Sequence, residues 1–203
     1  MTKYSRNEGH EEASLTLRMP SDEVDARTSR LSIGELLGRY EEFCNDTKSG
    51  KEMYPWASRF AMGYPLPSWQ RQFKWTEEQK QRFIHSIWSG VDLGSYLVNE
   101  LWEHQGAEGQ LHFRKFSEVL LDGQQRLTTL QEYVTNGFAV KDAAGIPRYW
   151  RDLPKVERRR FSLITFTKAT VSSWDEEVLR KVYDLRAFGG TAHTEEERAL
   201  PNG

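Results

Sequence analysis

The sequence predicts a single α+β domain over residues 30–203, preceded by a flexible N-terminal arm of residues 1–29. Three observations support this prediction. A chain of 203 residues is long enough for one full-sized domain and too short for two ordinary ones. Aromatic residues make up 12% of the chain, and such large apolar groups offset the entropy lost on folding. Helix-capping patterns alternate with short runs of strand-forming residues.

Two predicted helices stand on either side of an extended segment. Ser32 and Glu35 fit a capping box, and the apolar residues that follow at helical spacing predict a helix to about Asn45. Residues 64–71 contain two prolines, which oppose a helix and favour an extended conformation. A second capping pattern at Thr76 precedes another apolar stripe at helical spacing, and it predicts the second helix.

The middle of the chain combines predicted strands with a third helix. Residues 96–103, 111–116 and 118–121 are aliphatic and aromatic enough to form strands. Apolar residues at helical spacing predict a helix over 125–136. The last strand and this helix meet at Gly123, so a strand, a glycine turn and a helix follow one another directly.

The C-terminal part adds one strand and one helix to the prediction. Residues 161–166, FSLITF, have the composition of a strand. A third capping pattern begins at Ser173, and Gly189 and Gly190 are expected to end the helix that it starts. The sequence contains no internal repeat, so we expect these elements to form one domain.

Composition excludes several classes of protein. The single Cys44 rules out an intramolecular disulfide framework and a zinc site built from several cysteines. The formal net charge of −2 rules out a uniformly basic surface for nucleic acid, while a local basic patch stays open. No apolar run approaches the roughly 20 residues of a transmembrane helix, and the first residues lack the apolar core of a signal peptide. We therefore expect a soluble cytoplasmic protein.

The glycine turn is the strongest candidate for a binding site. The N-terminus of a helix presents unpaired N–H groups at the positive end of its dipole, which suits an anion. Gly123 lets the backbone approach a ligand closely, and Arg126 offers donors that match phosphate oxygens. Asp122 can hold Mg²⁺, and Gln124 and Gln125 add neutral hydrogen bonds. On residue types alone, a polar turn in which Arg126 pairs with Asp122 explains the string equally well.

Two further segments carry candidate binding residues. In the extended segment 67–75, alternate side chains face the same way, and Gln70 or Arg71 can reach a phosphate. Trp75 in this segment is expected in the core. A second group combines two glycines with hydroxyl and imidazole side chains, which can wrap around a ligand; it consists of Gly189, Gly190, Thr191 and His193. An exposed loop is the alternative interpretation of that group.

Together these motifs resemble those of a known family. Residues 120–130, LLDGQQRLTTL, are similar to the signature of the GmrSD-type restriction endonuclease N-terminal domain, within the ParB/sulfiredoxin-like superfamily. Residues 65–90 resemble the opening motif of that family, and Gln70, Arg71 and Trp75 stand at its QR and W positions.

The end of the chain resembles the closing motif of the same family. In residues 182–198, VYDLRAFGGTAHTEEER, Gly190 and Glu197 stand at the G and E positions of that motif. Two positions depart from the pattern: Ala187 stands where the family usually has Asn, and His193 stands where it usually has an apolar residue. Loss of the Asn amide is expected to weaken ligand binding or turnover.

The resemblance spans roughly residues 60–198 and implies a ParB/sulfiredoxin-like nucleotide-binding fold. It implies that the domain binds a nucleoside triphosphate with Mg²⁺ and supports its hydrolysis. Catalytic roles would belong to Asp122, Gln124, Gln125 and Arg126, with Asp122 also as the metal ligand. Ligand contacts would come from Gln70, Arg71, Gly123, Thr128, Gly189, Gly190, Thr191 and His193.

Three functions stay open at this point. The favoured one is a nucleotide-binding domain that hydrolyses its ligand. The second is a DNA-binding or nuclease module that uses local basic residues, and the third is a non-catalytic, phage-encoded protein that interacts with a host restriction complex. Larger family members carry a C-terminal nuclease domain of HNH type and restrict modified phage DNA. No such segment is found in these 203 residues, so we expect a separate nuclease subunit or host defence protein as partner, with DNA as an alternative and no membrane.

Overall fold

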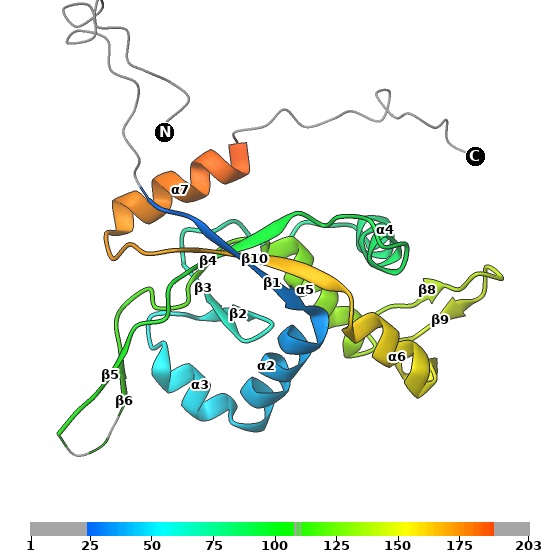
Figure 1. Cartoon of the computed structure of the whole chain (residues 1–203), viewed down its shortest axis with the longest axis horizontal. Helices are drawn as coiled ribbons and strands as arrows, with labels where there is room; N and C mark the ends of the chain where they lie inside the picture. Colours follow the sequence, from blue (N-terminus) through cyan, green and yellow to red (C-terminus); the bar gives the residue numbers. More distant parts are fainter. Residues whose placement is uncertain (1–23, 108, 110, 189–203) are drawn as a thin grey trace, which may run out of the picture.

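The computed structural model describes residues 24–107, 109 and 111–188 (Figure 1). Residues 1–23, which make up most of the predicted arm, lie outside the described residues. So do four predicted ligand contacts, Gly189, Gly190, Thr191 and His193.

A four-stranded sheet forms the centre of the domain. Its order is β1 (Arg27–Ser32), β10 (Thr165–Val171), β4 (Ser95–Asn99) and β7 (Leu120–Asp122). The pairs β1–β10 and β4–β7 are antiparallel, whereas β10–β4 is parallel. Since β1 begins at Arg27, the sheet includes residues that the sequence assigned to the flexible arm. The mixed α+β class agrees with the prediction, and its ParB/sulfiredoxin-like part stays a prediction.

Six α-helices in the described part of the chain surround this sheet: α2 (Ile33–Asn45), α3 (Thr47–Met53), α4 (Glu77–Trp88), α5 (Gln124–Val134), α6 (Lys155–Ser162) and α7 (Glu176–Phe188). Smaller elements connect them. They are β2 (Arg59–Ala61) with β3 (Tyr64–Leu66), β5 (Glu103–Gln105) with β6 (Leu111–Phe113), β8 (Val140–Lys141) with β9 (Pro147–Arg148), and the 3₁₀ turn η2 (Trp150–Asp152). None of these helices has the length and apolar character that a membrane span requires.

The two faces of the sheet bury separate cores. Along β4, Tyr96 and Val98 enter a core built with α2, α4, α5 and α6, while Leu97 enters a second core with α7. Leu120 and Leu121 of β7 divide in the same way, because successive side chains of a strand point to opposite faces. In Figure 1, α7 accordingly lies above the sheet and α2 below it.

The capping boxes predicted at Ser32 and Thr76 are confirmed. The Ser32 backbone N–H donates to the Glu35 carboxylate at 2.6 Å, and the Glu35 N–H donates to Ser32 Oγ at 3.3 Å. Thr76 and Gln79 exchange the same pair of bonds at the start of α4. These contacts join residues three positions apart, so the sequence pattern alone was enough to locate both helix starts.

In the C-terminal part, one prediction is wrong and one helix begins later than predicted. Residues 161–166 are not a strand, because α6 continues to Ser162 and β10 begins only at Thr165. Phe161 is buried as part of the helix, and Leu163 is exposed. A short apolar run does not distinguish a helix end from a strand. The helix predicted from the capping pattern at Ser173 is present as α7, and it begins at Glu176 because the Asp175 carboxylate accepts the Glu177 N–H at 2.8 Å and caps the helix.

Candidate functional site

The predicted strand, glycine turn and helix are present at the edge of the sheet. Strand β7 ends at Asp122, Gly123 has a φ of 103°, and α5 begins at Gln124. Unlike α2 and α4, this helix is capped by no side chain of the described residues, and none of them uses its first N–H groups as a capping residue.

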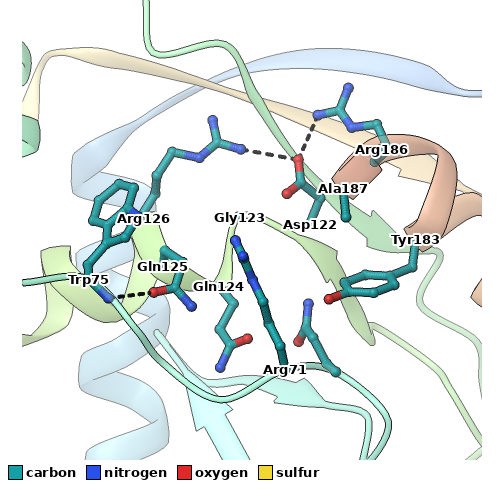
Figure 2. A pocket seen from close by; sticks show the side chains of 11 residues that line it. Arg71, Trp75, Asp122, Gly123, Gln124, Gln125, Arg126, Tyr183, Arg186 and Ala187 are labelled. Carbon is teal, nitrogen blue, oxygen red and sulfur yellow. Dashed lines mark hydrogen bonds and ion pairs between the residues drawn. The ribbon is translucent and has the colours of Figure 1, made fainter. Parts of the chain in front are cut away.

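A pocket of about 230 Å³ opens at this turn (Figure 2). Three segments far apart in the sequence line it. The loop before α4 contributes Gln70, Arg71 and Trp75, the turn and the first residues of α5 contribute residues 122–126, and α7 contributes Tyr183, Arg186 and Ala187. The first two segments were both predicted to bind a ligand, and the structure brings them together. Trp75 also packs on Phe83 of the core, with ring centroids 5.5 Å apart.

Gly123 is needed for packing as well as for the turn. A Cβ atom at this position would lie 2.6 Å from the Cβ atom of Tyr96 on β4, closer than side-chain carbons approach one another. Its positive φ is also one that residues with a side chain rarely adopt. The close approach predicted at Gly123 is therefore made to Tyr96, and the glycine lets the turn lie directly on the sheet.

We expect Gly123→Ala to lower the free energy of unfolding by about 2 kcal/mol, because it adds both a steric contact and backbone strain. Chemical denaturation measures this change. Gly90→Ala is the matched control, since Gly90 also has a positive φ but nothing lies within 4 Å of the added Cβ atom. Equal losses in the two variants would contradict the role given to Tyr96.

Arg126 is bound to the protein's own backbone. Its guanidinium donates to the carbonyl oxygens of Leu93 at 2.6 Å and Ser95 at 2.9 Å, and to Asp122 Oδ2 at 3.2 Å. Burial lowers the pKa of Arg126; the carboxylate of Asp122 opposes this decrease, and the nearby Arg186 adds to it. The ion pair between Arg126 and Asp122 is thus present, and the main contacts of Arg126 join α5 to the segment that leads into β4.

Asp122 is shared between two arginines. Its Oδ2 atom accepts hydrogen bonds from Arg126 at 3.2 Å and from Arg186 of α7 at 3.0 Å (Figure 2). Among residues 122–126 and the other lining residues it is the only carboxylate, and the described part of the chain holds no cluster of three potential metal ligands. Mg²⁺ at a nucleotide site is usually held by one or two carboxylates together with phosphate oxygens and waters. Asp122 can supply one such carboxylate, and its role as a metal ligand stays a prediction.

Gln125 holds the loop that carries Arg71. Its Oε1 atom accepts the backbone N–H groups of Lys74 at 2.9 Å and Trp75 at 3.1 Å, and its Nε2 donates to the Gln72 carbonyl at 3.3 Å. With both ends of the amide used in this way, Gln125 is a structural residue. The expectation that it contacts the ligand is not supported by this geometry.

Arg71, by contrast, has a guanidinium group without a hydrogen-bond partner among the described residues. The residue is exposed, and its side chain forms no hydrogen bond or ion pair with any described residue. Figure 2 shows that it extends toward the turn at Gly123. Arg71 is thus a cation of the pocket whose whole guanidinium is available to a ligand.

Gln70 and Gln124 present buried amide oxygens to the same pocket. The Oε1 atoms of both residues are buried and accept no hydrogen bond from the described residues. Such unpaired buried acceptors are rare in folded proteins. The two glutamines are therefore candidates for ligand contacts.

One site assignment needs adjustment, and two lining residues were not predicted as site residues. Thr128 is half-buried on α5 and does not line the pocket. Tyr183 and Arg186 do line it, although the sequence offered them only as part of a helix. Tyr183 follows the apolar Leu179 at helical spacing, which is a usable signal in the sequence. Arg186 has no such signal, because its contact is with Asp122, 64 residues away.

Comparison with known proteins gives two matches. A family model described as "GmrSD restriction endonuclease, N-terminal domain" matches residues 41–197. The "Uncharacterized protein MJ0686" of Methanocaldococcus jannaschii is 28% identical over 104 residues, which cover 45% of this chain and 18% of that protein. The matched stretch therefore spans less than a fifth of the length of this relative. No solved structure matches the chain.

Proposed function

Because the chain belongs to the family of GmrSD restriction endonuclease N-terminal domains, which relates it to restriction systems, we propose that the pocket binds a nucleoside triphosphate and supports its hydrolysis. The charge of the pocket is the observation that carries this proposal. Three guanidinium groups, those of Arg71, Arg126 and Arg186, surround one carboxylate, that of Asp122. The excess of positive charge favours an anion.

Arg71 and the start of α5 are the proposed phosphate ligands. Asp122 already neutralises part of the charge of Arg126 and Arg186, whereas Arg71 has no partner among the described residues. The uncapped N–H groups of α5 add donors at the positive end of the helix dipole. Guanidinium and backbone N–H groups together form the donor set that phosphate oxygens accept.

Hydrolysis of a triphosphate depends mainly on positioning and on stabilising the charge of the transition state. Arg71 would stabilise negative charge on the transferred phosphoryl group. The second carboxylate oxygen of Asp122 accepts no hydrogen bond from the described residues, and it is the acceptor available to orient an attacking water. No step of this proposal depends on a metal ion.

The proposal is tested by melting the protein with ATP, GTP, CTP or UTP, each at millimolar concentration. A ligand that binds only the folded state adds about 2.7 kcal/mol of stability at about 100 times its Kd. We expect at least one nucleotide to raise the melting temperature by about 5 °C, and release of phosphate to accompany it. The absence of a shift with all four nucleotides would reject the proposal.

The family also suggests the partners. DNA and a separate nuclease subunit or host defence protein are proposed partners on that basis alone.

A further inference from the structure

We infer that the amide oxygens of Gln70 and Gln124 accept hydrogen bonds from donor groups on the nucleoside part of the ligand. This inference rests on the proposed function, and it adds what the ligand must carry besides phosphate. It makes these two glutamines the residues that distinguish a nucleotide from an inorganic polyphosphate.

The orientation of the Gln70 amide is fixed by the sheet. Its Nε2 donates to the carbonyl oxygen of Leu121 on β7 at 3.1 Å. Rotating the amide would place two oxygen atoms against each other, so Oε1 must remain the free end. Gln70 is only 4% exposed, and no described group donates to that oxygen. The pocket wall therefore contains an acceptor of fixed direction.

Gln124 supplies the second acceptor. It is the first residue of α5 and is 6% exposed, and its Oε1 atom likewise has no donor among the described residues. Its neighbour Gln125 uses its whole amide to hold the loop before α4. The two adjacent glutamines thus have different roles, and only Gln124 is available to a ligand (Figure 2).

In the amide orientations of this structure, neither acceptor can be satisfied by phosphate. An ionised triphosphate offers only acceptor oxygens, which repel an amide oxygen, whereas Arg71 and the α5 N–H groups suit it well. In the inferred complex, the missing donors come from ribose hydroxyls or from N–H groups of the base. The pocket consequently has a donor side for phosphate, with Arg71, and an acceptor side for the nucleoside, with Gln70 and Gln124.

Titration calorimetry with inorganic tripolyphosphate and with the best-bound nucleoside triphosphate tests the inference. We expect the wild type to bind the nucleotide at least about tenfold more tightly than tripolyphosphate, which corresponds to the energy of about one hydrogen bond. Gln124→Met keeps the side-chain length and removes the acceptor. It should weaken nucleotide binding about tenfold and leave tripolyphosphate binding unchanged.

Two further variants keep the test decisive. Gln72→Met is the matched control, because Gln72 lies in the same loop and does not line the pocket; its nucleotide affinity should equal that of the wild type. Gln70→Met should also weaken nucleotide binding selectively. Because it removes the bond to Leu121 as well, its melting temperature without ligand is measured in parallel, and binding is compared below that temperature.

The outcomes separate this inference from the proposed function. If tripolyphosphate binds as tightly as every nucleotide, or if Gln124→Met weakens both ligands equally, the inference is overturned while anion binding stands. If neither ligand binds, the proposed function fails as well. The affinity of a 2′,3′-dideoxynucleotide then identifies the source of the donors. If it binds more weakly than the ribonucleotide, the sugar hydroxyls are the donors. If it binds equally well and the protein prefers one of the four bases, the base supplies them.

Discussion

Replacing Arg71 by alanine is expected to weaken nucleotide binding about a hundredfold, since a hydrogen bond to a charged group contributes about 1.5–3 kcal/mol. The melting temperature without ligand should stay unchanged, because the exposed Arg71 side chain contacts no described residue through hydrogen bonds or ion pairs. Titration calorimetry measures the first effect, and thermal unfolding measures the second.

Arg126→Ala is the matched comparison, an arginine of the same pocket whose donors are used internally. Its removal leaves the carbonyl oxygens of Leu93 and Ser95 without their guanidinium partner and releases Asp122 from one of its two ion pairs. We expect it to lower the free energy of unfolding by about 2 kcal/mol. If Arg71→Ala bound nucleotide normally, or if Arg126→Ala melted at the wild-type temperature, this division of roles would be wrong.

The second large effect is expected at Glu118, in the loop that leads into β7. Its carboxylate accepts two hydrogen bonds from Arg39 of α2, both at 2.8 Å, and one from the Tyr54 hydroxyl at 2.7 Å. Arg39 also donates to the Gly63 carbonyl at 3.2 Å and covers the ring of Tyr64. This buried network attaches α2 and the end of α3 to the strand that carries the site.

Glu118→Gln should lower the free energy of unfolding by about 3 kcal/mol, because it leaves the Arg39 guanidinium without its counter-charge in a mostly buried position. Chemical denaturation at neutral pH measures this loss. The control is Glu78→Gln, which removes an exposed ion pair with Arg82 and is expected to cost less than about 0.5 kcal/mol. Similar losses in the two variants would contradict the importance of the buried pair.

The same network predicts a pH dependence. Burial alone would raise the pKa of Glu118, but the charge of Arg39 and the hydrogen bonds from Arg39 and Tyr54 outweigh it, so the pKa lies below its ordinary value of 4.5. A lowered pKa means that the ionised form stabilises the fold above pH 4.5, and that this contribution is lost as the pH falls through the lowered value. The stability difference between wild type and Glu118→Gln should therefore shrink in acid. A difference that stayed constant would refute the assignment.

Local patterns in the sequence were sufficient for the elements of the site. The capping boxes at Ser32 and Thr76 depend on residues three positions apart, and Gly123 between an apolar run and a helical stripe marked the strand–turn–helix unit. The mixed fold class followed from the same alternation. At residues 161–166 this approach failed, because a short apolar run has no period long enough to separate a helix end from a strand.

The roles of the side chains in the pocket depended on contacts between distant segments. Gln125 reaches the backbone of Lys74, 51 residues away, and Arg186 reaches Asp122 across 64 residues. Such contacts leave no periodic signal in the sequence, so the DGQQR string could be located but its residues could not be given separate roles. The donors of Arg126 and the amide of Gln125 hold distant segments together, whereas the Arg71 guanidinium and the Gln124 Oε1 atom have no partner among the described residues.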